Sequence, residues 1–189
     1  GSDSLAGKRI IVQGAGHVGQ YLIDYLVKEG AKVGVSDIFA DKIKEVKHKF
    51  PKVDIVDPNG IYDEAMDIYA PCALGATIND DTLSKLKCAI IAGAANNQLA
   101  NEAKHGQIVV DKGMIYAPDF LINAGGLINC YSELEGYNRD RAMSKTEEIY
   151  NTTMNILIRA EQNSMPTYQA ANEMAEQRIE AIGNINKVL

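Results

Sequence analysis

The chain contains few of the residues that build disulfide frameworks. Only three of its 189 residues are cysteines, an odd number, and no two of them form a C-x-x-C pair. This pattern is typical of reduced thiols in a cytoplasmic protein, and it argues against both disulfide bonds and a cysteine zinc site. The three are Cys72, Cys88 and Cys130.

Histidine is equally scarce. His17, His48 and His105 are the three histidines of the chain, and they lie far apart in the sequence. Histidines scattered in this way do not indicate a metal site, which needs several ligands close together. His48 and His105 lie in polar stretches, so we expect both at the surface.

Long apolar runs and blocks of basic residues are also missing. No run approaches the roughly 18 residues that a membrane span requires. The N-terminus lacks the basic, apolar and small-residue pattern of a signal peptide. The formal net charge is -6 with no basic block, which argues against a nucleic-acid or anionic-membrane partner. The composition, 46% hydrophobic and 23% charged, is typical of a globular domain with a sizeable core.

A glycine-rich loop lies near the start of the sequence. Residues 14–19 read GAGHVG, between a short apolar run and an amphipathic stretch. In a strand–loop–helix unit, the first glycine permits a sharp turn and the second lets backbone N–H groups approach a pyrophosphate. The third lets the helix pack on the sheet, and the helix N-terminus favours phosphate. The pattern predicts nucleotide binding; a purely structural turn is the alternative.

An acid follows this loop at the spacing that dinucleotide-binding folds use. Asp37 ends the next expected strand, about 20 positions after the loop. A carboxylate there binds the adenine-ribose hydroxyls and repels a 2′-phosphate, and no arginine follows it. The sequence therefore favours NAD over NADP, with Lys42 and Lys44 expected on the following helix. A solvated loop acid is the other interpretation of Asp37.

Short apolar strands alternate with helices along the first two thirds of the chain. We expect strands at 9–12, 32–36, 53–56, 67–70, 89–92, 109–110 and 115–116, and helices at 18–29, 41–50 and 79–87. This alternation predicts right-handed βαβ units, and hence an α/β fold of the Rossmann type with a doubly wound, mostly parallel sheet. In the first helix, the buried face is expected to hold Val18, Leu22, Tyr25 and Leu26. The helix at 79–87 is expected to be capped by Asn79 or Asp80.

The last third of the chain predicts a helical C-terminal tail from Asn123 onward. Residues 144–147 read SKTE, which is either a capping box or part of a longer helix that starts near Arg139. A break at 163–166 separates this helix from a final one. Thr167 is expected to cap that final helix, which runs to about Ile182.

Polar and thiol side chains follow the later strands. Cys72 comes just after the fourth strand, where ligands collect in a doubly wound sheet. It could line a cofactor, pack in the core or act as a nucleophile, although no catalytic partner is evident. Asn96 and Asn97 follow the next strand, and they either face a nicotinamide or cap the helix after it. Asn123, before Gly125 and Gly126, could bring an amide to the same edge; the alternative is that the two glycines only permit the entry into a helix.

Several segments together resemble the amino-acid dehydrogenase superfamily of glutamate, leucine, valine and phenylalanine dehydrogenases, and most of all the leucine dehydrogenases. They are "VQGAGHVG", "VDPNGIYDEAMDIYAPCALGATIND", "IAGAANNQL", "YAPDFLINAGGLIN", "EGYNRDRAM" and "PTYQAANEMAEQRIE". The segments cover almost the whole chain in the order that the family has. The resemblance implies NAD-dependent oxidative deamination of an apolar L-amino acid, with leucine or another branched-chain amino acid favoured over phenylalanine.

The resemblance also assigns roles to individual residues. The cofactor-binding positions are Gly14, Ala15, Gly16, His17, Val18, Gly19, Gln20, Asp37, Cys72, Ala73, Asn97 and Asn123. Two positions line the substrate side-chain pocket, Leu127 and Cys130. The family usually has asparagine where this chain has His17, and Cys130 fits neither the leucine nor the phenylalanine enzymes cleanly.

The resemblance further implies a second, N-terminal substrate domain that supplies two active-site lysines and an aspartate. Nothing in this chain matches their motifs, so we expect no catalytic residue here and no turnover by these residues alone. Residues 1–8 are expected to form a hinge segment and 9–189 the NAD-binding domain. The full-length protein is expected to be a homo-oligomer. A noncatalytic nucleotide-sensing domain of a transporter is the alternative function, because such domains open with a similar loop and acid.

Overall fold

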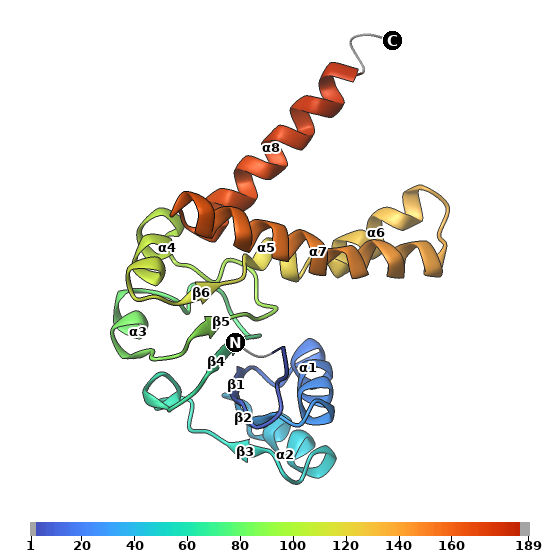
Figure 1. The fold of residues 1–189 in the computed structure, drawn as a ribbon. Coiled ribbons are helices and arrows are strands. Elements are labelled where there is room, and N and C mark those ends of the chain that lie inside the picture. The colour runs from blue at the N-terminus through green and yellow to red at the C-terminus, as the bar shows by residue number, and fades with distance from the viewer. Residues whose placement is uncertain (1–2, 186–189) are drawn as a thin grey trace.

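A single six-stranded parallel sheet organises the protein (Figure 1). The computed structural model describes residues 3–185. The strand order is β3-β2-β1-β4-β5-β6, which is the order of a doubly wound dinucleotide-binding fold. The strands are β1 Arg9–Gln13, β2 Lys32–Ser36, β3 Asp54–Ile55, β4 Ile68–Pro71, β5 Ile90–Ile91 and β6 Ile115–Tyr116. The predicted α/β Rossmann-type fold is confirmed.

Helices connect the strands and continue into the C-terminal third. They are α1 His17–Lys28, α2 Ala40–Lys49, the short 3-10 helix η1 Ile61–Asp63, α3 Asp80–Lys85, α4 Glu102–Asp111, α5 Asp119–Ile122, α6 Gly125–Leu134, α7 Arg139–Asn163 and α8 Thr167–Ile185. The SKTE segment lies inside α7, so it is not a separate helix start. Thr167 does not cap α8 as expected, because it is the first residue of the helix and its hydroxyl donates to the carbonyl of Tyr116 at 2.6 Å.

The sheet is covered by helices on both faces because its central strands alternate their side chains between two cores. Ile10 and Val12 of β1 point to the core that holds α1 and α2. Ile11 points to the opposite core, with Leu83 of α3 and Val109 of α4. Burial on both faces explains why these strands are almost wholly apolar in sequence.

The C-terminal helices form a separate layer. Helices α7 and α8 pack against each other through a small cluster of Ile156, Ala160, Ala170 and Ala171, and the rest of α8 projects away from the body (Figure 1).

No helix in the described part of the chain is long and apolar enough to cross a membrane. Residues 3–8 stay close to the sheet, since Gly7 N–H donates to Gly30 O at 2.9 Å.

Three further expectations about burial and local structure were wrong in whole or in part. In α1, Leu26 is buried and Leu22 packs against the core as expected, but the inward face also holds Gly19 and Ile23. Val18 is 56% and Tyr25 65% exposed, contrary to the expectation. The phase differs because Gly19 must touch the glycine loop, as described below. Residues 109–110 belong to α4 and are not a strand.

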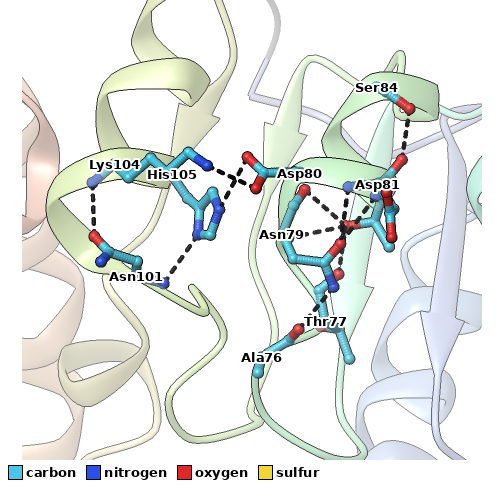
Figure 2. Close-up of polar contacts among 10 residues, drawn as sticks. Ala76, Thr77, Asn79, Asp80, Asp81, Ser84, Asn101, Lys104 and His105 are labelled. Carbon is cyan, nitrogen blue, oxygen red and sulfur yellow. Dashed lines mark hydrogen bonds and ion pairs between the residues drawn. The ribbon is translucent and has the colours of Figure 1, made fainter.

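His105 is the third correction, because it is buried and not at the surface. Its Nδ1 accepts the Asn101 backbone N–H at 2.9 Å, which gives the ring a partner inside the fold. Its Nε2 lies 3.5 Å from Asp80 Oδ1, at the start of α3 (Figure 2). The polar residues around His105 in the sequence gave no sign of this contact between α4 and α3.

The position of Ile23 gives a test of the packing. Replacing Ile23 with Ala should lower the free energy of unfolding by about 2–5 kcal/mol, because the side chain is fully buried and a cavity remains. The matched change Tyr25→Ala, on the exposed face, should cost less than about 0.5 kcal/mol. Urea denaturation followed by circular dichroism measures both. Equal losses would mean that the assigned face of α1 is wrong.

Candidate nucleotide site

The strand order brings the predicted site residues into one row. All six strands are parallel, so their carboxyl ends lie at the same edge of the sheet. Along this edge, Asp37 follows β2, Gly14 follows β1, Cys72 follows β4, and Asn97 and Asn123 follow β5 and β6. The chain leaves β1 toward one side and β4 toward the other, which is where such sheets open a crevice for ligands.

A cleft of about 560 Å³ lies at this point, within the usual range for small-molecule sites. It is lined by Gln13, Gly14, Gly16, Ser36, Asp37, Ile38, Phe39, Lys42, Pro58, Cys72, Ala73, Leu74 and Thr77. Five predicted residues therefore meet here: Gly14, Gly16, Asp37, Cys72 and Ala73. Asn97, Asn123, Leu127 and Cys130 do not line this cleft.

The three glycines of the loop have different surroundings. Gly14 has a φ of +109°, and a Cβ on it would lie 2.8 Å from the carbonyl group of Cys72. A Cβ on Gly19 would lie 2.1 Å from Gly14 O, so the helix can approach the loop only if this residue is glycine. A Cβ on Gly16 would meet no atom within 4 Å. Contacts within the fold require glycine at 14 and 19, whereas Gly16 borders open space that lines the cleft.

The other residues of the loop differ in exposure. Ala15 is fully buried, while His17 and Val18 are exposed. The His17 ring packs edge-on against Tyr21 with centroids 5.0 Å apart. Gln20 donates from Nε2 to Ala15 O at 3.1 Å, which stiffens the loop from within. The His17 side chain therefore points along α1, outside the cleft lining.

Asp37 is tied directly to the glycine loop. Its Oδ2 accepts the Ala15 backbone N–H at 2.7 Å, and its Oδ1 accepts the Phe39 N–H at 2.8 Å. A carboxylate oxygen keeps further acceptor capacity after one such bond. Asp37 is thus a structural brace whose carboxylate also lines the cleft, which differs from a solvated loop acid.

Sequence reasoning missed the apolar wall of the cleft. Ile38 is 76%, Phe39 64% and Leu74 77% exposed, although all three are large apolar side chains. Exposed apolar side chains around a polar centre are typical of a binding site. The signal in the sequence was the pair Ile38–Phe39 directly after Asp37, in a loop that would otherwise be polar.

Polar groups at the base of the cleft test whether a nucleotide fits. Ser36 is 1% exposed, and its Oγ has no hydrogen-bond partner among the described residues. Two tyrosines hold the side chain of Gln13. Its Oε1 accepts from Tyr69 Oη at 2.5 Å, and its Nε2 donates to Tyr62 Oη at 3.0 Å. Burial raises the pKa of Tyr69, which keeps this phenol a donor. A hydroxyl without a partner, beside an open glycine cradle, fits a ligand with hydroxyl or phosphate oxygens.

Cys72 lines the cleft with a thiol that is poorly suited to nucleophilic chemistry. Burial raises its pKa, so the thiolate fraction at neutral pH falls below that of an ordinary cysteine. Its backbone N–H donates to Gln13 O at 2.7 Å, which links the ends of β4 and β1. Cys72 both packs against the core beneath α1 and lines the cleft, so the structure agrees with the lining and core-packing interpretations and not with a nucleophile.

The loops after β4 and β5 are joined to each other. Ala76 N–H donates to Asn97 O at 2.7 Å, and Ile78 N–H to Gln98 O at 3.0 Å. Ala76 and Asn97 both have left-handed backbones, with φ of 57° and 51°. Strained residues of this kind persist only where the surroundings hold them, and they gather at functional sites. Asn97 does not cap the next helix, because Asn101 does.

Helix α3 fixes the end of this loop pair (Figure 2). Asn79 caps the helix by accepting from the N–H groups of Asp81 and Thr82, and its Nδ2 donates to Ala76 O at 3.1 Å. Asp80 contacts Lys104 of α4 at 2.6 Å, and this hydrogen bond holds the pKa of Asp80 below its usual range. The predicted capping by Asn79 or Asp80 is confirmed for Asn79.

The two positions predicted to line the substrate pocket lie on α6. Leu127 is 74% exposed and Cys130 is exposed as well. They are three residues apart, so they share a face of the helix. Within the described residues, no cluster of three or more histidine, cysteine, aspartate or glutamate side chains is placed to hold a metal ion.

Comparison with known proteins shows the family of the chain. Residues 38–186 match the family model for glutamate/leucine/phenylalanine/valine dehydrogenases. The chain belongs to this family. It is 50% identical over 180 residues to leucine dehydrogenase from Thermoactinomyces intermedius, covering 95% of this chain and 49% of that protein. It is 40% identical over 190 residues to phenylalanine dehydrogenase from the same organism, covering 100% of this chain and 52% of that protein.

A solved structure agrees as well. The crystal structure of L-tryptophan dehydrogenase from Nostoc punctiforme superposes with a TM-score of 0.92 at 43% identity, covering 95% of this chain and 55% of the other. The chain thus spans about half the length of the curated relatives it matches. A nucleotide-sensing domain of a transporter is not favoured by these findings.

Burial at Cys72 predicts the order in which the thiols react. With iodoacetamide at mildly alkaline pH, the exposed Cys130 should be labelled first and Cys72 much more slowly, because its raised pKa leaves less thiolate. Peptide mass spectrometry measures each site, and the unfolded protein serves as the control in which the rates converge. Labelling of Cys72 as fast as Cys130 in the folded protein would contradict this environment.

Proposed function

We propose that this chain is the NAD-binding part of an amino-acid dehydrogenase, acting in the oxidative deamination of an apolar L-amino acid to a 2-oxo acid and ammonium. The row of residues along the sheet edge carries this proposal. From β2 to β6 it presents an acid, a glycine cradle, a thiol-lined turn and two asparagines. This order corresponds to adenine ribose, pyrophosphate and nicotinamide along a bound dinucleotide.

Each residue of the row has a chemical task in this proposal. Backbone N–H groups around Gly16, at the N-terminus of α1, would hold the pyrophosphate. Asp37 would accept from the ribose hydroxyls, and Cys72 and Ala73 would line the middle of the cofactor. Asn97 and Asn123 would hold the nicotinamide end. NAD, when bound, supplies the acceptor for the hydride that leaves the substrate.

Charges near Asp37 support NAD over NADP. The Asp37 carboxylate would repel a 2′-phosphate. Lys42 also lines the cleft, but its ammonium group contacts Glu45 at 3.0 Å, and this hydrogen bond lowers the pKa of Glu45. The charge of Lys42 is therefore balanced by a neighbour on the same helix. Little positive charge is left near Asp37 to attract the 2′-phosphate of NADP.

The identity of the substrate depends on residues outside this chain as well. Leu127 and Cys130 would form one wall of a side-chain pocket of apolar character. Relatives named leucine, phenylalanine and L-tryptophan dehydrogenase all match this chain. We propose leucine or another branched-chain amino acid first and phenylalanine second. A substrate domain with two lysines and an aspartate would complete the site, and homo-oligomerisation of the complete cytoplasmic enzyme stays a prediction.

Two glycine substitutions separate ligand binding from folding. Gly16→Ala should keep the free energy of unfolding within about 0.5 kcal/mol, since its Cβ meets no protein atom, but it should weaken NAD binding at least tenfold by filling the cradle. Gly19→Ala should destabilise the fold itself, because its Cβ overlaps Gly14 O. Calorimetric titration and urea denaturation measure the two effects. Undiminished NAD affinity in Gly16→Ala would refute the cradle.

Activity assays test the reaction. Residues 1–189 should bind NAD but produce no NADH with any amino acid, because the proposed lysines lie elsewhere. The complete protein should produce NADH with NAD and leucine, valine or isoleucine, and more slowly with phenylalanine. Failure of the complete protein with all four substrates would contradict the substrate class. Turnover by residues 1–189 would contradict the proposal that the catalytic lysines lie outside these residues.

A further inference from the structure

A buried acid lies beneath the two loops that carry the asparagines. Asp119 is 5% exposed and is the first residue of α5. Within residues 3–185, no cationic side chain lies at ion-pair distance from it. A buried carboxylate without a cation is expensive in free energy, so it persists only where hydrogen bonds satisfy its oxygens.

Backbone N–H groups supply those hydrogen bonds. Asp119 Oδ2 accepts the N–H of Gln98 at 2.8 Å, across 21 positions of sequence, and Oδ1 accepts the N–H of Phe120 at 2.8 Å. The carboxylate therefore connects the loop after β5 to the segment after β6. Gln98 itself is fully buried, and its Nε2 donates to Gly93 O at 2.6 Å and Ala95 O at 2.9 Å. Loop 93–98 is thus held around the side chain of Gln98. Asp119 positions Gln98 by accepting its backbone N–H.

The same two segments meet a second time at the surface. Asn123 Nδ2 donates to Asn96 Oδ1 at 2.5 Å. Asn123 lies one helical turn after Asp119, and its backbone N–H donates to Asp119 O at 3.0 Å. Asn97, with its left-handed backbone, lies between Asn96 and Gln98. The buried Asp119 and the exposed Asn96 therefore hold Asn97 and Asn123 in fixed positions relative to each other.

We propose that Asp119 is a positioning residue that sets Asn97 and Asn123 for the nicotinamide end of the cofactor, with Asn96 as the second point of this clamp. The proposal rests on the proposed NAD-binding function. It assigns no contact with NAD to Asp119, whose buried carboxylate acts through the two loops. The adenosine cleft, built from β1, β2 and β4, shares no residue with the clamp.

Two ligands separate positioning from a general effect on folding. ADP-ribose contains every part of NAD except the nicotinamide ring, so the ratio of NAD affinity to ADP-ribose affinity reports the contacts of that ring. Asp119→Asn keeps the size of the side chain, but its amide group faces a backbone N–H that needs an acceptor. Calorimetric titration of this chain should show NAD affinity reduced about tenfold, with ADP-ribose affinity unchanged within about twofold.

A surface variant covers the case in which Asp119→Asn fails to fold. Asn96→Ala removes the second clamp point at an exposed position, and it should lower NAD affinity about threefold while ADP-ribose binding is kept. Asp63→Asn is the matched control, because it loses only an exposed contact to Lys85 at 3.5 Å and should change neither affinity.

The outcomes are distinct. A reduced ratio of NAD to ADP-ribose affinity in the two clamp variants, but not in the control, supports the positioning role. An unchanged ratio in Asn96→Ala and in any folded Asp119→Asn protein overturns it, as does an unaltered protein that binds NAD no tighter than ADP-ribose. An unaltered protein that binds neither ligand would instead show that the proposed function is wrong.

Discussion

The contact on which the site depends is the one between the backbone of Gly14 and the backbone of Cys72 and Ala73. A Cβ on Gly14 would lie 2.8–2.9 Å from these atoms, so the turns after β1 and β4 can touch only because this side chain is absent. With the turn held there, Gly19 can pack on Gly14 O, α1 points its N-terminus at the cleft, and Asp37 reaches the Ala15 N–H. One close approach between neighbouring strand ends thus places the cradle, the helix dipole and the carboxylate together.

The two halves of the site are held by different physical means. The side proposed for adenosine is formed by backbone geometry and by apolar side chains such as Ile38 and Leu74, which line a preformed cleft. The other side is formed by long-range hydrogen bonds between loops, centred on the buried Asp119 and Gln98. A cradle of backbone N–H groups does not depend on the side chains of its residues, whereas a hydrogen-bonded clamp depends on each partner. The two residues of α6 that we propose for the substrate pocket lie on an exposed helix face.

Much of this account could be predicted from the sequence, for local reasons. The order of most strands and helices, the glycine loop and the Asn79 cap depend on residues close together in the chain, and the structure agrees with them, except that residues 109–110 lie in α4 and not in a strand. The phase of α1 could not be predicted from apolar periodicity, because the contact between Gly19 and Gly14 decides which face is buried. His105 and Asp119 were misjudged or missed since their partners, Asp80 and Gln98, lie more than 20 positions away. A polar residue that pairs across such a distance looks the same in sequence as one that faces water.

The most direct measurement for this account is the crystal structure of the chain with NAD bound. The account predicts the adenine ribose at Asp37, the pyrophosphate over Gly16 at the N-terminus of α1, and the nicotinamide ring beside Asn97 and Asn123. It also predicts that the Asp119–Gln98 contact persists in the complex. A dinucleotide bound in the opposite direction along the sheet edge, or bound away from Gly16, would contradict the account.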